Sequence, residues 1–181
     1  MTILHGEGTI DYLTLHFRNA NGGTFEWISN KQAAMQNAKI NYSYSEGVDV
    51  HGSDLFFVCK FLRMTLDLDG GTWRRDSTVS GLFDGNPDQL VRILQNPRDL
   101  LYFTEEANSR SGIHARDESA CFYTIMESMV YPGEATGLSL SPDARFMYVS
   151  YQDVGKLFCL WRVDGNAFGA EHLDMNFHNN P

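Results

Sequence analysis

The sequence predicts an all-β fold made of β-propeller blades, and three observations support this prediction. The apolar runs are short and rich in Tyr, Phe, Val, Leu and Thr, and Gly, Asn, Asp and Pro interrupt them every few residues. This pattern is typical of consecutive antiparallel strands. A hairpin pattern recurs three times, and helical sequence is confined to residues 30–39. A fixed period favours radial architectures, whereas the alternative, a sandwich or barrel, needs no such period.

The N-terminal part of the chain predicts two strands and a connector. Residues 12–17 and 24–28 flank an Asn-Gly-Gly turn and have the composition of strands. Residues 30–39 (NKQAAMQNAK) follow, where Asn30 could cap a short helix. An irregular connecting segment is the alternative. We therefore expect residues 1–29 to be the outer strands of a first blade and residues 30–44 to be a connector.

The remaining chain predicts three similar blades. The second strands of the three hairpins begin at Leu55, Leu100 and Phe146, which are 45 and 46 residues apart. Each hairpin is followed by a third apolar run, so the predicted blades cover residues 45–77, 86–128 and 133–174, with a tail at 175–181. A propeller usually has about 4 to 8 blades. We therefore expect residues 1–181 to form one partial propeller domain of about three blades and part of a fourth, completed by missing residues or by another protein chain.

Charge and composition narrow the classes of partner. The 181 residues contain 14 Lys and Arg against 23 Asp and Glu, a net charge of −9. Binding to nucleic-acid phosphates needs clustered positive charge, which the sequence lacks. No apolar run approaches the roughly 18 residues of a membrane span, and the N-terminus lacks a signal-peptide pattern. We expect no nucleic-acid partner and no membrane insertion. Cations and neutral or cationic ligands stay as candidates.

The three cysteines predict buried thiols rather than a metal cluster. Cys59, Cys121 and Cys159 each lie among apolar residues, where a small buried thiol is the usual arrangement.

An acidic residue stands at the start of each predicted innermost strand: Glu46, Asp88 and Glu134. Innermost strands of a propeller line one central channel, so these side chains are expected to converge. Converging carboxylates repel one another unless a cation lies among them, and carboxylate oxygens suit Ca²⁺. Gln89, backbone carbonyls and water would complete a shell of about 6 to 8 oxygens. The alternative is that each acid caps a turn or faces water.

A second polar cluster follows the second strand of the middle blade. It comprises Glu105 and Glu106 and then residues 109–118 (SRSGIHARDE). We expect a loop here, in which Glu105, Glu106, His114 and Arg116 could bind an anionic or sugar-like ligand or donate protons. A solvated loop without such a role is the alternative. Nucleophilic catalysis finds no support, because the sequence has no Gly-x-Ser-x-Gly elbow, no Walker loop and no His-Glu-x-x-His.

The same segments resemble the later blades of the PhoX-type alkaline phosphatase family, which has many bacterial and algal members. The resemblance covers about residues 26–165, and the matching segments are SEGV at 45–48, NPDQL at 86–90, LYFTEE at 101–106, GEATGLSLSPD at 133–143, YQDVG at 151–155 and WRVDG at 161–165. The resemblance implies a calcium-dependent phosphatase built on a propeller. It also implies a secreted, periplasmic or organelle-lumen location. The Pro-Asp-x-Leu and Glu-Gly motifs occur as well in other calcium-bearing propellers, such as the gluconolactonase and paraoxonase-like enzymes.

The resemblance further implies roles for the acidic residues. Glu46 and Glu134 match glutamates that hold calcium and iron above the substrate phosphate, and Asp88 matches an acid of the channel rim. Two departures matter: Gln89 stands where Asn is common, and the family's earlier blades, with a cysteine and further acidic ligands, have no counterpart here. The role of that cysteine does not transfer to Cys59.

Two functions follow from these observations. The first is a PhoX-like calcium-binding propeller, with metal-dependent phosphoester hydrolysis only if the rest of the ring is supplied. The alternative is a non-catalytic binding or scaffold subunit of a larger protein assembly.

Overall fold

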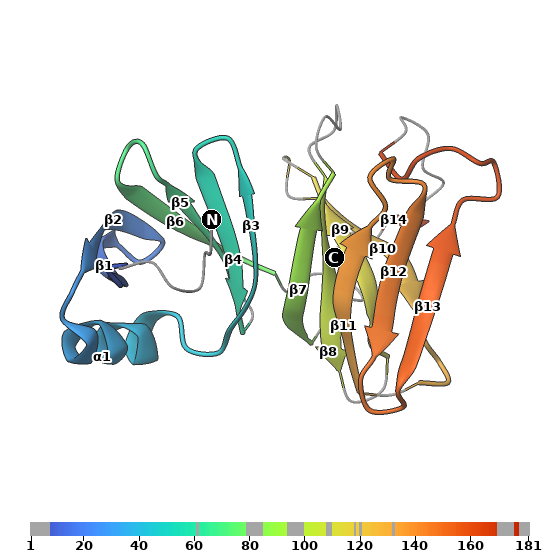
Figure 1. Cartoon of the computed structure of the whole chain (residues 1–181), viewed down its shortest axis with the longest axis horizontal. Coiled ribbons are helices and arrows are strands. Elements are labelled where there is room, and N and C mark those ends of the chain that lie inside the picture. The colour runs from blue at the N-terminus through green and yellow to red at the C-terminus, as the bar shows by residue number, and fades with distance from the viewer. Residues whose placement is uncertain are drawn as a thin grey trace.

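The computed structural model describes residues 8–60, 62–78, 85–93, 100–107, 110–117, 119, 121–131 and 133–169, and the backbone of 176–177. Within these residues the strands form two curled antiparallel sheets, one of them a half-barrel, and α1 (Lys31–Asn41) is the helix (Figure 1). The prediction of an all-β fold is thereby confirmed. No helix in the described part of the chain is long and apolar enough to cross a membrane.

The N-terminal sheet has the strand order β1-β2-β6-β5-β4-β3. Its strands are β1 (Tyr12–Asn19), β2 (Gly22–Ile28), β3 (Ser45–His51), β4 (Asp54–Cys59), β5 (Leu62–Asp67) and β6 (Thr72–Ser77). The sheet contains the hairpins that the sequence predicted. In addition, β2 pairs with β6, although 43 residues lie between the end of β2 and the start of β6. The two predicted N-terminal strands are therefore the outer strands of this sheet.

The helix α1 forms where the sequence predicted it, so the irregular connector is wrong. Asn30 caps it, because its Oδ1 accepts a hydrogen bond of 3.1 Å from the Ala33 backbone nitrogen. Asn37 ties the helix to β1: its amide donates to the Leu15 oxygen and accepts from the Leu15 nitrogen, both at 3.0 Å. These bonds satisfy the backbone of a strand that lies at the edge of its sheet.

The C-terminal sheet has the order β13-β12-β11-β8-β9-β10-β14, and β7 also pairs with β8. Its strands are β7 (Asn86–Arg92), β8 (Leu101–Ala107), β9 (Gly112–Arg116), β10 (Phe122–Glu127), β11 (Gly133–Leu140), β12 (Phe146–Tyr151), β13 (Lys156–Trp161) and β14 (Asn176–Phe177). Two of these strands differ from the sequence prediction. β9 replaces part of the expected loop, and β14 pairs with β10 where we expected only a tail.

Three apolar clusters hold the sheets together. One lies inside the N-terminal sheet and includes Phe57 and Trp73. A second lies inside the C-terminal sheet and includes Tyr102 and Met147. The third joins the two sheets, and its members are Phe56, Val58, Leu90, Leu101, Phe103 and Phe122.

The two sheets approach most closely where β3 meets β7. A Cβ atom built on Gly47 would lie 2.5 Å from the Leu90 nitrogen, 2.7 Å from the Gln89 Cα and 2.8 Å from the Asp88 oxygen. All three are backbone atoms, which cannot rotate away as a side chain would. Asp49, two residues further along β3, accepts a hydrogen bond of 2.8 Å from the Arg92 backbone nitrogen. Because Gly47 has no side chain, β3 and β7, which belong to different sheets, can lie in direct contact.

This contact predicts a large effect for Gly47→Ala. We expect the substitution to lower the free energy of unfolding by about 1–3 kcal/mol, because the new methyl group overpacks a junction made of backbone. Urea unfolding followed by tryptophan fluorescence measures the change. The control is Gly8→Ala, since nothing lies within 4 Å of a Cβ at Gly8; it should shift stability by less than about 0.5 kcal/mol. Equal effects of the two substitutions would contradict the prediction.

Candidate functional site

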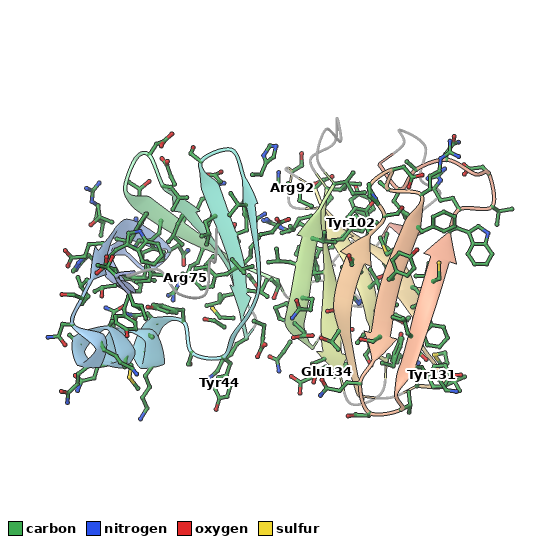
Figure 2. All side chains as sticks on the ribbon, in the orientation of Figure 1. Tyr44, Arg75, Arg92, Tyr102, Tyr131 and Glu134 are labelled. Atoms are coloured by element: carbon green, nitrogen blue, oxygen red, sulfur yellow. The ribbon has the colours of Figure 1, made fainter. Side chains whose placement is uncertain are left out.

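A cavity of about 560 Å³ opens between the two sheets, at the end where β3, β7 and β11 begin. In Figure 2, the labelled Tyr44 and Glu134 lie at this end of the two sheets, and Arg92 lies nearer the opposite end. The residues that line the cavity are Tyr44, Glu46, Lys60, Asn86, Pro87, Asp88, Glu106 and Glu134. The structure thus brings the three acids singled out from the sequence to one cavity and adds Glu106.

Irregular strand pairing positions two of these acids. The register of β3 against β4 shifts between Ser45 and Val48, so Glu46 lies in the irregular segment. The register of β7 against β8 shifts in the same way around Asp88. Such bulges bend a strand and change the direction of a side chain. Because the two irregular segments touch at Gly47, they present Glu46 and Asp88 to the same space.

Asp88 is the most deeply placed acid of the cavity. Its exposed fraction is 6%. Among the residues that the structure describes, its Oδ2 atom is buried and has no hydrogen-bond partner. A buried carboxylate oxygen without a partner costs free energy, and such a group calls for an explanation such as an ion or ordered water.

The other two acids, Glu106 and Glu134, come from neighbouring strands of the C-terminal sheet. Glu134 on β11 is opposite Glu106 on β8 in the strand pairing. Gln152 Nε2 donates a hydrogen bond of 3.1 Å to Glu134 Oε2, and Asn86 Nδ2 lies 3.5 Å from Glu106 Oε2. Each of these carboxylates therefore has a neutral amide as its neighbour, which orients it without neutralising it.

Burial and the neighbouring carboxylates raise the pKa of two acids of the cavity, Glu46 and Glu134. Burial is the largest cause of the raised pKa of Glu46, followed by the charges of Asp88 and Glu106. The pKa of Glu134 is raised by burial first and then by Asp88, Glu106 and Glu46, with a further contribution from Asp153. The cavity is therefore a region of negative potential that a cation would relieve.

One lysine and one tyrosine form the rim of the cavity. Lys60 Nζ lies 4.8 Å from the centroid of the Tyr44 ring, a cation–π contact. Both residues have left-handed backbone angles, with φ of 47° at Lys60 and 57° at Tyr44. Non-glycine residues rarely adopt this conformation, and those that do are frequent at ligand sites.

The oxygen atoms of the cavity are of the type that a hard cation prefers, but they are not grouped closely around one point. Carboxylate and amide oxygens are the ligands that Ca²⁺ prefers. Within the described residues, however, no three His, Cys, Asp or Glu side chains are grouped closely enough to hold one ion. A cation would need bridging water or a rotation of Glu46 and Glu106, and both of these side chains are exposed. Cys59 is buried in the cluster inside the N-terminal sheet and is not among the residues that line the cavity. Cys159, which the sequence predicted to be buried, is exposed.

The second polar cluster divides into three parts. Glu106 lines the cavity, whereas Glu105 and His114 form a buried pair with exposed fractions of 0% and 1%. Glu105 Oε2 lies 3.1 Å from His114 Nε2, and Glu105 Oε1 accepts 2.6 Å from the Gly85 nitrogen. Arg116 is buried between the sheets, with its Nη1 3.7 Å from Asp76 Oδ2. These groups lie on strands β8 and β9 rather than on the exposed loop that we expected.

Sequence reasoning missed Glu106 as a member of the cavity and missed the burial of His114. Glu105 and Glu106 are neighbours on one strand, so their side chains point to opposite faces. That alternation is a signal from which different environments could have been predicted for Glu105 and Glu106.

Comparisons of this chain with known protein families, with curated proteins and with solved structures find no match.

The raised pKa of Glu134 predicts how stability depends on pH. The folded state holds a proton on Glu134 more tightly than the unfolded chain does, so stability falls as pH rises from the ordinary glutamate range through the raised pKa. In metal-free buffer at pH 7 we expect Glu134→Gln to raise the melting temperature by about 1–3 °C, because one repelling charge is lost. The amide oxygen of Gln can still accept the bond from Gln152.

The gain should vanish in acid, where Glu134 of the wild type is already protonated. Calorimetry at several pH values measures it. Asp11→Asn, an exposed change just before β1, is the control and should have no such effect. A lower melting temperature for Glu134→Gln at pH 7 would mean that the carboxylates do not repel one another.

Proposed function

We propose that this chain is a calcium-binding unit of a β-propeller-type assembly, with its ion in the cavity of Glu46, Asp88, Glu106 and Glu134. The observation that carries the proposal is the buried and unpartnered oxygen of Asp88, a residue that lines the same cavity as the three other carboxylates. Ca²⁺ tolerates irregular shells of about 6 to 8 oxygens, including water, so it does not require a preformed group of three side chains.

The strand arrangement supports the propeller part of the proposal. The predicted innermost strands β3, β7 and β11 lie in one row, because β7 contacts both of its neighbours. Each of the three has its acid near the same end, at the cavity. In a propeller this row would surround the axis, and the remainder of the ring would come from missing residues or from another protein chain.

Phosphoester hydrolysis, which the resemblance to the PhoX-type family implies, belongs to this proposal only in a completed ring. A bound Ca²⁺ would polarise a phosphoryl oxygen and offset its charge. The chain's own contribution is to place carboxylates around the ion and Lys60 at the rim, where an ammonium group can meet an anion. Further metal ligands would have to come from the rest of the ring.

The second candidate is a non-catalytic binding or scaffold subunit. A specific observation favours it: the outer side of β12 and β13 exposes several large apolar side chains, among them Leu157 and Trp161. Exposed apolar patches of this kind mark protein interaction sites.

Calcium titration followed by melting temperature tests the shared premise. At calcium about 100 times above its dissociation constant we expect a rise of about 5–10 °C, because the ion binds the folded state. Asp88→Asn should reduce this rise strongly, while the matched Asp11→Asn change should leave it intact. Mg²⁺ should act more weakly, because it demands a regular octahedral shell. No rise at millimolar Ca²⁺, or an equal rise in Asp88→Asn, would reject the calcium site.

Turnover of a chromogenic phosphomonoester and of a phosphodiester, measured on the chain assembled with the rest of its ring, separates the two functions. Calcium-dependent turnover that is lost in Glu134→Gln would support the hydrolase. Calcium binding without turnover would favour the binding or scaffold subunit.

A further inference from the structure

Three arginines are largely buried where the two sheets meet: Arg63 on β5, Arg92 on β7 and Arg116 on β9. Arg92 is 8% exposed and Arg116 is 7% exposed, and the side chain of Arg63 is 12% exposed. None of the three lines the acid cavity, and Arg92 lies nearer the opposite end of the sheets from Glu134 (Figure 2). We call these residues the arginine cluster. Arginine is rarely buried unless its charge and its N–H groups are paired.

Strand pairing places the arginine cluster on the faces that the two sheets turn toward each other. In the N-terminal sheet, Arg63 is opposite Val58. In the C-terminal sheet, Leu101 is opposite both Arg92 and Arg116. Directly opposed residues share a face of a sheet. Because Val58 and Leu101 belong to the apolar cluster that joins the sheets, the three arginines point into the same junction.

Two buried phenylalanine rings contact the guanidinium groups. Arg92 Cζ lies 4.5 Å and Arg63 Cζ 5.9 Å from the centroid of the Phe56 ring. Arg116 Cζ lies 5.7 Å from the centroid of the Phe122 ring. Such cation–π contacts stabilise a buried guanidinium group. They do not provide the oxygen acceptors that its N–H groups need.

One carboxylate bonds to two of the arginines. Asp76 Oδ2 accepts a hydrogen bond of 2.8 Å from Arg63 Nη2 and lies 3.7 Å from Arg116 Nη1. Both contacts use Nη atoms of the guanidinium groups. The single carboxylate of Asp76 therefore leaves the Nε–H groups of Arg63 and Arg116 without an acceptor.

Three further acids act on the arginine cluster through their charge: Asp49, Asp54 and Asp117. The oxygens of Asp49 accept hydrogen bonds from backbone nitrogens. Those of Asp117 accept from the Cys121 nitrogen and the Tyr123 hydroxyl. These acids reduce the repulsion among the arginines, but the bonds of Asp49 and Asp117 go to other donors.

Three polar atoms of this junction are buried and have no hydrogen-bond partner among the residues that the structure describes. They are Nε of Arg63, Nε of Arg116 and Oγ1 of Thr65. Thr65 stands two residues after Arg63 on β5, so the two side chains share a face, and Phe56 is opposite Thr65. All three atoms can donate a hydrogen bond. Buried donors without an acceptor cost free energy and call for an ion or ordered water.

The pKa values agree with this geometry. Burial is the largest cause of the lowered pKa of Arg92 and of Arg116, and the charge of Arg63 is the second cause for both. The exposed Arg74 lowers the pKa of Arg116 further. The folded state therefore opposes the positive charges of the cluster, and a bound anion would relieve this repulsion.

We propose that Arg63, Thr65 and Arg116, with Arg92 beside them, bind a tetrahedral oxyanion with the chemistry of phosphate. Guanidinium groups are well suited to phosphate, because their N–H groups donate in parallel to its oxygens. Donors that come from two sheets can each meet a different oxygen of a tetrahedral ion, whereas a carboxylate offers only two oxygens. The side chain of Asp76 is 36% exposed, so solvent reaches the junction beside it. The site is separate from the acid cavity and does not depend on calcium.

Calorimetric titration with inorganic phosphate tests the proposal, in metal-free buffer at constant ionic strength. The wild type should bind one phosphate per chain, and acetate should bind more weakly. Arg116→Lys keeps the charge but loses the planar guanidinium group, so it should raise the dissociation constant about tenfold or more. The matched control is Arg18→Lys, an exposed residue of β1, which should bind like the wild type. Glu134→Gln should also leave phosphate binding unchanged, because Glu134 lines the other site.

Asp76→Asn provides a second variant with the opposite expectation. It removes the carboxylate that competes for the guanidinium groups, so phosphate should bind more tightly than in the wild type. Phosphate should also raise the melting temperature of Asp76→Asn more than that of the wild type, relative to chloride at the same ionic strength. A purely structural role of Asp76 would lower stability without this response to phosphate.

Phenyl phosphate identifies the source of the anion. Weaker binding than that of inorganic phosphate would support a site for the free ion, and equal binding would support a site for the phosphate group of a larger molecule. Three results would overturn the proposal: no binding of millimolar phosphate to the wild type, binding that Arg116→Lys leaves unchanged, or binding that Arg18→Lys weakens equally. Melting curves of all variants verify that they fold.

Discussion

The contact of β3 with β7 at Gly47 is the constraint on which the rest of the structure depends. Two sheets can be joined by side chains alone, but their backbones then stay about 10 Å apart. Here the missing side chain of Gly47 lets the backbones touch, with the Asp88 oxygen among the nearest atoms. Phe56 and Leu90 close the apolar cluster beside this point. The same contact brings Glu46 and Asp88, from different sheets, to one cavity, so the packing and the candidate site share one cause.

The acid cavity is electrostatically unfavourable and structurally supported. Burial and mutual repulsion raise the pKa of Glu46 and Glu134, which means that the folded state opposes their charges. The ladders of β8 with β7 and β11 nevertheless hold the strands in place, because Glu106 pairs through its backbone on both sides. A site that conflicts with its own stability while the surrounding fold is well packed is typical of a binding function.

The sequence predicted most strands and α1, because alternation, turn residues and a capping Asn are local signals. It also predicted which acids stand near the starts of β3, β7 and β11. It did not predict β9, whose segment GIHAR contains two residues that are usually exposed. His114 can be buried because it pairs with Glu105, and Arg116 can be buried because it pairs with Asp76, which comes from the other sheet. Such distant partners leave no local pattern. The sequence also did not predict the bulges at Glu46 and Asp88, because a bulge arises from the pairing of two strands.

The repeat also explains why similar residues have different environments. Phe57, Tyr102 and Tyr148 stand at equivalent positions, two residues after Leu55, Leu100 and Phe146, on the second strands of the three units. Phe57 is buried in the cluster inside the N-terminal sheet, and Tyr102 is buried in the cluster inside the C-terminal sheet. Tyr148 has the same aromatic character with no following layer in the described residues. A residue type suited to burial therefore remains exposed because the repeat continues in composition but not in packing.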